Sequence, residues 1–292
     1  MQSKSEELYV QCGGGHTLPV TRPIIMGILN VTPDSFSDGG RFVDAEYALR
    51  HARMMASEGA ALIDVGGEST RPGAMAVSAD DELARVLPVV RSLADGGLCV
   101  SVDTSKPEVM RAAADAGAAM INDVRALREP GALAAAASTD LAVCLMHMQG
   151  EPRTMQVAPR YDDVVSEVCE FLLDRARACE EAGIDRRRIV LDPGFGFGKS
   201  LEHNLSLLAG LERIVACGYV VLVGLSRKSM LQALTGRAVD DRLAGSITLA
   251  VMSALSGAHI IRVHDVAATR DALAVVSALK EAQARSKPPQ EQ

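Results

Sequence analysis

Polar side chains stand directly after short apolar runs at eight places along the chain. Each place carries an amide, an acid, a base or a cation; in order these are Asn30, Asp64, Asp103, Asn122, His147, Asp192, Lys228 after a short GLSR turn, and Arg262 with His264. A single aspartate in such a place is more often a helix N-cap than a functional residue. Capping does not explain the whole set, because a cap need not be an amide, an acid or a base in particular. We interpret these positions as one site built from the ends of several strands.

Four of these positions suit the edge of a flat heterocycle. Carboxylates such as Asp103 and Asp192 accept hydrogen bonds from ring N–H and exocyclic amine groups. The Asn122 amide supplies both a donor and an acceptor, and Lys228 can donate to a carbonyl oxygen or a ring nitrogen. An amino-oxo heterocycle is therefore the predicted class of ligand.

The last predicted strand carries two cationic or basic side chains. Arg262 and His264 are two residues apart, so they point to the same side of the strand. Together with Asn30 they could hold an anion. Phosphate or pyrophosphate is the candidate, because the loops after the last two strands of a barrel form its usual phosphate site.

The stretch Ile24–Gly40 combines a short apolar run with a polar loop. Loops at the carboxyl ends of strands carry the chemistry of many α/β proteins. We expect Asn30 to lie on the rigid strand end. We expect Asp34, Ser35 and Phe36 to belong to a lid loop that closes when pyrophosphate is present.

Strands that alternate with helices must position these residues. Eight apolar runs have the length of strands; they are Ile24–Leu29, Ala61–Val65, Leu98–Val102, Ala119–Ile121, Leu141–Met146, Arg188–Leu191, Val220–Gly224 and His259–Val263. Amphipathic segments such as 162–183 separate them and are long enough for crossover helices. Eight strands, each followed by a helix, predict an α/β fold of the parallel (β/α)₈ type, a TIM barrel, with a doubly wound open sheet as the alternative.

The ends of the chain differ from this repeating pattern. Residues 1–23 predict a short β-hairpin around a triple-glycine turn, which would cap the barrel. Residues 24–284 form the predicted single catalytic domain. Residues 285–292 are polar with two prolines, and we expect a disordered tail there.

Composition narrows the class of protein. The chain has 292 residues, of which 48% are hydrophobic, enough for one large α/β core. The formal charge of -7 argues against nonspecific nucleic-acid binding but is compatible with a small basic pocket for anions. The sequence shows neither a signal-peptide pattern nor an apolar run of membrane-spanning length. Six scattered cysteines without a C-x-x-C pair favour reduced thiols, so we expect a cytoplasmic protein with no membrane partner.

Three motif resemblances fail in their details. Residues 193–200, PGFGFGKS, have Pro193 where a Walker A loop needs glycine, which argues against an ATPase. The segment around Ser226 lacks the second glycine of a nucleophile elbow, which argues against a hydrolase. His147 and His264 lack metal-ligand spacing with a third residue, and either could be a satisfied core or rim histidine.

Eight motifs together closely resemble the dihydropteroate synthase family of pterin-binding barrels. In chain order they are GILNVTPDSFSDGG from Gly27, DVGGESTRPG from Asp64, SVDTSKP from Ser101, INDV from Ile121, MHMQGEP from Met146, LDPGFGFGKS from Leu191, GLSRKS from Gly224 and IIRVHDV from Ile260. Each motif falls at a predicted strand end, in the family's order. The resemblance implies a transferase of folate biosynthesis. It would condense 6-hydroxymethyl-7,8-dihydropterin pyrophosphate with 4-aminobenzoate to give 7,8-dihydropteroate and pyrophosphate.

The resemblance also implies roles for the matching residues. The implied catalytic residues are Asp103, Asp192, Lys228 and Arg262. The implied pterin-binding residues are these four with Asn122, Met146 and Phe197. The implied pyrophosphate site consists of Asn30, which also coordinates Mg²⁺, and Thr70, Arg262 and His264. The implied aminobenzoate site consists of Phe36, Thr70, Arg71, Pro72, Phe197, Lys228 and Ser229. A homodimer is the family expectation.

The residue types suit a dissociative displacement of pyrophosphate. Mg²⁺, arginine and histidine would neutralise the leaving group, and no nucleophile is arranged for a covalent enzyme intermediate. Two alternatives are a methyltetrahydrofolate methyltransferase barrel and a noncatalytic pterin-binding paralogue. The first needs a corrinoid partner and has no use for residues that bind pyrophosphate. The second does not account for the filled catalytic positions.

Overall fold

Eight parallel strands close into a barrel in the computed structural model, which describes residues 8–31, 40–69, 76–151 and 154–286. The strands are β3 (Ile24–Asn30), β4 (Leu62–Gly66), β5 (Val100–Asp103), β6 (Met120–Asp123), β7 (Ala142–Met146), β8 (Ile189–Asp192), β9 (Val220–Val223) and β10 (Ile260–Val263). They pair in chain order, and β10 pairs with β3 to complete the circle. The predicted TIM barrel is confirmed, and the open sheet was the wrong alternative.

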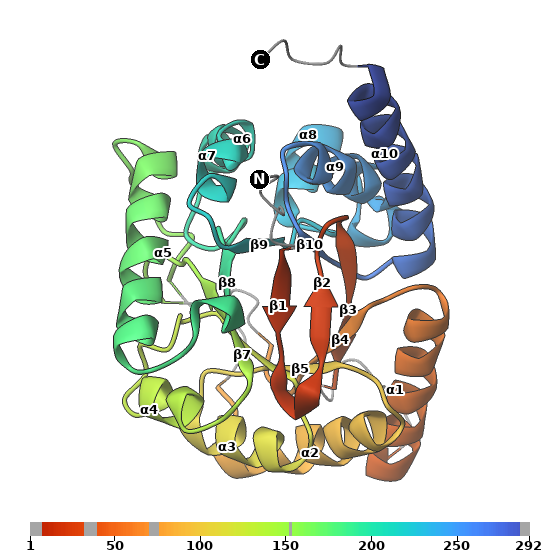
Figure 1. Ribbon diagram of the computed structural model, residues 1–292, viewed down its shortest axis with the longest axis vertical. Coiled ribbons are helices and arrows are strands. Elements are labelled where there is room, and N and C mark those ends of the chain that lie inside the picture. Colours follow the sequence, from red (N-terminus) through yellow and green to blue (C-terminus); the bar gives the residue numbers. More distant parts are fainter. Residues whose placement is uncertain (1–7, 32–39, 70–75, 152–153, 287–292) are drawn as a thin grey trace, which may run out of the picture.

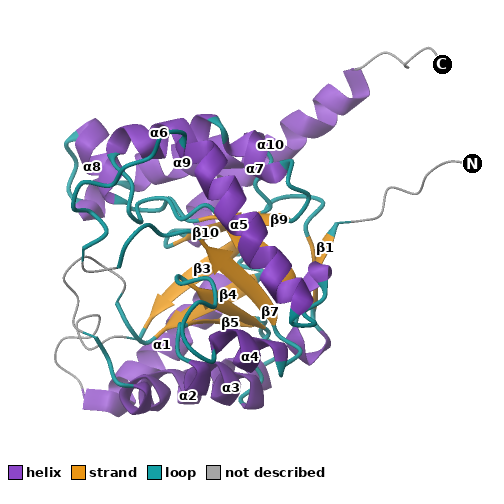
Figure 2. Ribbon diagram, turned by 90° about the vertical axis from the view of Figure 1, so that its left-hand side faces the viewer, coloured by secondary structure: helices purple, strands orange, loops and turns teal. Residues whose placement is uncertain are grey.

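Helices lie outside the barrel strands (Figures 1 and 2). They are α1 (Gly40–Ser57), α2 (Ala79–Asp95), α3 (Pro107–Asp115), α4 (Ala132–Ala137), α5 (Val164–Glu181), α6 (Leu201–Ala209), α7 (Leu211–Val215), α8 (Ser229–Thr235), α9 (Leu243–Leu255) and α10 (Val266–Ser286). Side-chain caps begin α2 at Ser78 and α5 at Asp163. The last helix extends two residues past the predicted domain end at 284. Within the described ranges, no helix has both the length and the apolar character needed to cross a membrane.

Alternation along each strand decides which side chains enter the barrel. Leu62 and Ile260 belong to the cluster that fills the interior. Ile63, the next residue along β4, packs in the larger cluster between strands and helices. Side chains two residues apart share one face of a strand. Asp64 and Arg262 therefore continue the inward rows that begin with Leu62 and Ile260.

The predicted N-terminal hairpin is confirmed. Its strands β1 (Tyr9–Gln11) and β2 (Thr17–Pro19) pair antiparallel (Figure 1). The hairpin side chain of Val10 is buried in the interior cluster. The N–H of Gly13 in the turn donates to the carbonyl of Ala119 at 2.9 Å. The hairpin thus packs against the amino ends of the barrel strands, which leaves their carboxyl ends to the connecting loops.

Candidate active site

The guanidinium of Arg262 joins several strand ends in one hydrogen-bonded cluster. Its Nε donates to Asp64 Oδ2 at 2.6 Å, and a terminal nitrogen donates to Asp103 Oδ2 at 3.0 Å. The Asn122 amide donates to the same Asp64 oxygen at 3.0 Å. Four strands, β4, β5, β6 and β10, therefore contribute to one polar network inside the barrel.

Asp64 is the hub of this network, although sequence reasoning noted it only as a strand-end residue and gave it no role. Its side chain is fully buried, and its Oδ1 has no hydrogen-bond partner among the described residues. A buried carboxylate oxygen without a donor is costly unless a ligand or water supplies one. The signal that could have identified Asp64 is its inward position, two residues after Leu62.

Burial and mutual charge shift the pKa values of the cluster. Burial, with a contribution from Asp64, raises the pKa of Asp103 to about 7. Burial and the nearby Arg262 lower the pKa of Lys228 to about 8. Burial also raises the pKa of Asp192, against the hydrogen bond from the Gly194 N–H at 2.8 Å. Such shifted acids and cations in one cluster are typical of binding and catalytic sites.

Phe197 and Met146 form an apolar wall beside the charged residues. Both are buried, and they pack in a small cluster with Val124, Met148 and Met155. The ammonium of Lys228 lies 4.1 Å from the centre of the Phe197 ring, a cation–π contact. The site therefore offers apolar surface for a flat ring next to polar groups for its edge.

His264 contacts the hydroxyl of Ser226. The Ser226 hydroxyl accepts the backbone N–H of His264 at 3.3 Å and lies 3.0 Å from its Nδ1. A hydrogen bond from the hydroxyl to Nδ1 would place the ring proton on Nε2. Burial and the charge of Arg262 lower the pKa of His264 to about 3. The imidazole is therefore neutral near neutral pH, and its ring N–H can act as a donor.

Asn30 stands near Arg262 and His264 at the same end of the barrel. It is the last residue of β3, which pairs with β10. Because Arg262 pairs with Met26, Asn30 lies in the same inward row, two residues beyond the level of His264. Its side chain is exposed. These three residues thus share the open rim of the barrel.

The remaining expected residues divide into two groups. Ser229 is exposed and begins α8 directly after Lys228. Six expected residues lie outside the described ranges; they are Asp34, Ser35, Phe36, Thr70, Arg71 and Pro72.

Lys199 is, after Asp64, a second residue whose part sequence reasoning missed. It was set aside with the failed Walker motif, yet it is buried and contacts His147.

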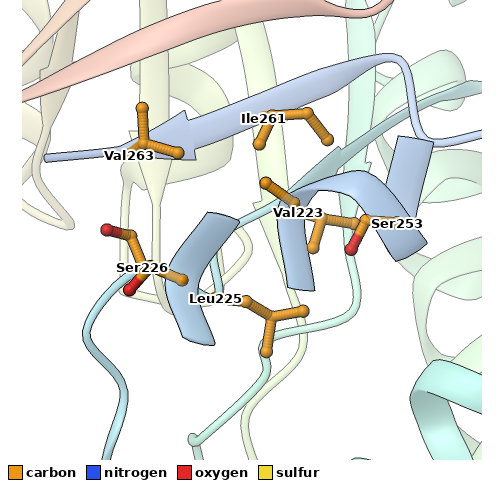
Figure 3. A pocket seen from close by; sticks show the side chains of 8 residues that line it. Val223, Leu225, Ser226, Ser253, Ile261 and Val263 are labelled. Atoms are coloured by element: carbon orange, nitrogen blue, oxygen red, sulfur yellow. The ribbon is translucent and has the colours of Figure 1, made fainter. Parts of the chain in front are cut away.

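A small apolar hollow lies apart from this site (Figure 3). Val223, Ile261 and Val263 line it from the barrel strands, and Ser253 of α9 lines it from the helix layer. These strand residues belong to the strand–helix core and not to the barrel interior. The hollow shares Ser226 with the active site, but it offers no group of the charged cluster.

Comparison with known proteins assigns the family. The model of the pterin binding enzyme family matches residues 26–264. Dihydropteroate synthase of Escherichia coli K12 is 56% identical over 265 residues, which cover 90% of this chain and 94% of the relative.

Solved structures agree with this assignment. A Yersinia pestis dihydropteroate synthase in a sulfonamide drug complex is 51% identical with a TM-score of 0.89, and the match covers 94% of this chain and 99% of that one. The Xanthomonas albilineans enzyme with 4-aminobenzoic acid is 53% identical with a TM-score of 0.89, and the match covers 97% of this chain and 100% of that one. Another structure of that enzyme holds 7,8-dihydropteroate. With its barrel, its strand-end cluster and these relatives, the chain belongs to the dihydropteroate synthase family.

Proposed function

We propose that the strand-end cluster carries out the reaction of this family by a dissociative displacement. Family membership makes the chain a transferase that forms dihydropteroate in folate biosynthesis. The substrates would be 6-hydroxymethyl-7,8-dihydropterin pyrophosphate and 4-aminobenzoate. The observation that carries the proposal is the buried network of Arg262, Asp64, Asp103 and Asn122, with an Asp64 oxygen that lacks a donor.

The pterin edge would bind to Asp103, Asn122, Asp192 and Lys228. The carboxylates accept from the ring N–H and amine groups, and Lys228 donates to a ring oxygen or nitrogen. Arg262 would pack on one face of the ring, whereas Met146 and Phe197 supply apolar surface. Burial of both ring faces excludes water from the reacting carbon.

Pyrophosphate would leave toward the rim that carries Asn30, Arg262 and His264, with Thr70 as a further expected contact. The bond between the pterin methylene carbon and the pyrophosphate oxygen breaks, and its electron pair leaves with pyrophosphate. The aminobenzoate nitrogen then bonds to that carbon and loses a proton. Arg262 provides positive charge and His264 a donor where negative charge grows on the leaving group.

Mg²⁺ fits the chemistry of this rim. Mg²⁺ prefers oxygen ligands and commonly keeps waters and substrate phosphate oxygens, with only one or two ligands from the protein. The Asn30 amide oxygen, exposed at the end of β3, would be such a ligand. When bound, Mg²⁺ would neutralise charge on the departing pyrophosphate.

4-Aminobenzoate would bind next to Phe197, Lys228 and Ser229. Ser229 begins α8, so its backbone N–H can face the benzoate carboxylate. The family pattern adds Phe36, Thr70, Arg71 and Pro72. The loop with Asp34, Ser35 and Phe36 would be a lid, and its protection from proteolysis should rise on addition of pyrophosphate and Mg²⁺. The sulfonamide drug bound by the Yersinia pestis relative supports sulfonamides as inhibitors here.

We further propose a cytoplasmic homodimer. All six cysteines are free thiols, which suits a reducing compartment. Five large apolar side chains are exposed on the adjacent helices α9 and α10; they are Leu243, Met252, Leu255, Val275 and Leu279. Exposed apolar side chains on neighbouring helices are typical of subunit interfaces. Sedimentation at micromolar concentration tests the dimer.

The direct test is synthesis of dihydropteroate. The purified protein is incubated with dihydropterin pyrophosphate, 4-aminobenzoate and Mg²⁺, and the product is separated and quantified. Product that requires all three additions supports the proposal. A protein that binds the pterin substrate without turnover would instead be a noncatalytic paralogue. Methyl transfer from methyltetrahydrofolate to a corrinoid would identify the methyltransferase alternative.

A further inference from the structure

The side chain of Lys199 is enclosed between the loops that follow β7 and β8. The residue is only 3% exposed. Its Nζ lies 2.9 Å from the Gly194 carbonyl, 3.1 Å from the Phe197 carbonyl and 2.9 Å from Nδ1 of His147. An ammonium group has three N–H donors. Three acceptors lie within 3.1 Å of this one, and the His147 carbonyl is a fourth, more distant acceptor at 3.5 Å. The geometry fits a cation held by uncharged groups.

His147 takes part in this arrangement as an acceptor. Burial and the positive charge of Lys199 lower the pKa of His147 to about 2, so its ring is neutral. Its Nδ1 therefore accepts from Lys199, and its proton is on Nε2. The ring packs edge-on against Phe171, with ring centres 4.9 Å apart. The position of His147 is thus fixed from both sides.

The two loops pack backbone against backbone around this ammonium. Gly194 and Gly198 have φ values of 67° and 62°. A Cβ on Gly194 would collide with the His147 carbonyl, and one on Gly198 with the Gln149 carbonyl. The His147 N–H also donates to the Asp192 carbonyl at 2.9 Å. The backbones of the two loops therefore leave no room for a side chain at Gly194 or Gly198. Carbonyl groups buried between such loops are costly unless a donor reaches them.

We propose that Lys199 is a positioning residue, an internal cation that holds the loop after β8 against the loop after β7 and thereby fixes Asp192 and Phe197 for the pterin substrate. The inference rests on the proposed function. Lys199 contacts the Phe197 carbonyl directly, and the carbonyl it contacts on Gly194 belongs to the residue whose N–H binds Asp192. Burial lowers the pKa of Lys199 to about 7, whereas the charge of Asp192 raises it. The three acceptors favour the charged form.

Chemical rescue tests this role in the full chain. Lys199→Ala removes the ammonium and leaves its space, whereas Lys199→Met fills the space without a donor. We expect both variants to lose about 10–100-fold in kcat/KM for dihydropterin pyrophosphate, the range for displaced binding groups. Ammonium or methylamine should restore activity to Lys199→Ala in a saturable way and leave Lys199→Met unchanged. Tetramethylammonium at equal ionic strength should restore neither.

A matched control separates the role of the Lys199 ammonium from general effects of amines on the enzyme. Lys280 is a partly buried lysine on α10 whose Nζ donates to one carbonyl, that of Ala254. Lys280→Ala should keep wild-type kcat/KM and show no response to ammonium. Near wild-type activity of Lys199→Ala, or equal stimulation of all variants by ammonium, overturns the proposal.

Thermal unfolding keeps the inference separate from the proposed function. Ammonium should raise the Tm of Lys199→Ala but not that of wild type or Lys199→Met. This result supports the proposed role of Lys199 even if the wild type forms no dihydropteroate. A wild type that forms no dihydropteroate would overturn the proposed function alone. If neither variant folds with any added amine, Lys199 is needed for the whole fold, and its role as a positioning residue is overturned.

Discussion

The two ends of the barrel interior differ in chemistry although the same strands form both. At the amino end, Leu62 and Ile260 belong to one buried apolar cluster with residues of the N-terminal hairpin. At the carboxyl end, one inward step along the same two strands, Asp64 and Arg262 form an ion pair at 2.6 Å. A two-residue step thus separates residues that hold the fold from residues that do chemistry.

The comparison also teaches where the fold gains and loses stability. Buried apolar side chains at the amino end stabilise the barrel by about 1.5–3 kcal/mol each. Buried charges at the carboxyl end contribute little or oppose folding, because they lose their hydration. The amino end and the helix layer therefore stabilise a carboxyl end that is arranged for a ligand.

The largest expected effect is on turnover at the carboxyl end. Lys228→Ala and Asp192→Ala should each abolish detectable dihydropteroate synthesis, a loss of at least about 10²–10³-fold, because each removes a charged group from the pterin site. Their Tm values should stay close to wild type, since neither side chain supports the apolar core. Product formation and thermal unfolding are measured on the same samples. Near wild-type activity in either variant would show that the site assignment is wrong.

Arg262→Met should affect both activity and stability. It leaves Asp64 and Asp103 buried without their cation, which costs about 3–5 kcal/mol of unfolding free energy.

This loss should depend on pH because of Asp103. The folded-state pKa of Asp103 is about 7, above its ordinary value of 3.8, so folding favours the protonated form. The stability from this group is present at low pH and is lost as pH rises through about 7. Without Arg262 that pKa rises further, so the destabilisation should be larger at about pH 8 than at about pH 5. Urea unfolding at both pH values measures it, and an equal loss at both would contradict the role given to Asp103.

Leu222→Ala should produce the opposite phenotype from Lys228→Ala. Leu222 is fully buried in the interior cluster beneath the hairpin. A cavity there should lower the unfolding free energy by about 2–5 kcal/mol. At a temperature where the variant is folded, its kcat should equal that of the wild type. A lower kcat in fully folded protein would mean that the two ends of the barrel are coupled.

Tyr9→Phe should have the smallest effect. Tyr9 is the first residue of the hairpin strand β1, and its hydroxyl accepts a hydrogen bond from Arg187 at 3.1 Å on the protein surface. An exposed hydrogen bond contributes less than about 1 kcal/mol. A slightly lower Tm with unchanged activity is expected. A large drop in Tm would mean that the surface hydrogen bond of Tyr9, and not the buried side chain of Val10, holds the hairpin in place.

Much of the fold follows from the sequence because each strand is a short apolar run between helical segments. The polar cluster follows as well, since Asp103, Asn122 and Arg262 stand at the ends of those runs and meet in the barrel. The hub role of Asp64 could not be read from the sequence, because the residue lies inside a short apolar run that does not show which face of the strand enters the barrel. The correct inward face becomes evident only from the register of β4 against its neighbours.

Lys199 shows a second limit of sequence reasoning. Two of the acceptors around its ammonium are backbone carbonyls, which every residue carries and which leave no pattern in the sequence. The third acceptor, His147, lies 52 residues earlier and could not be linked to Lys199 by spacing. Glycine at positions 194 and 198 allows another backbone to approach closely. Nothing in the sequence identified which loop that backbone belongs to.

The hairpin has a consequence for how the chain reaches its native state. Val10 belongs to the same buried cluster as Leu222 and Ile260, which come from the last two strands. The surface that receives the hairpin is therefore complete only after β10 has paired with β3. During synthesis, the hairpin is made before the barrel strands. It can bury its apolar side chains only when nearly the whole barrel has formed. A nascent chain arrested before β10 should leave this segment accessible to chaperones.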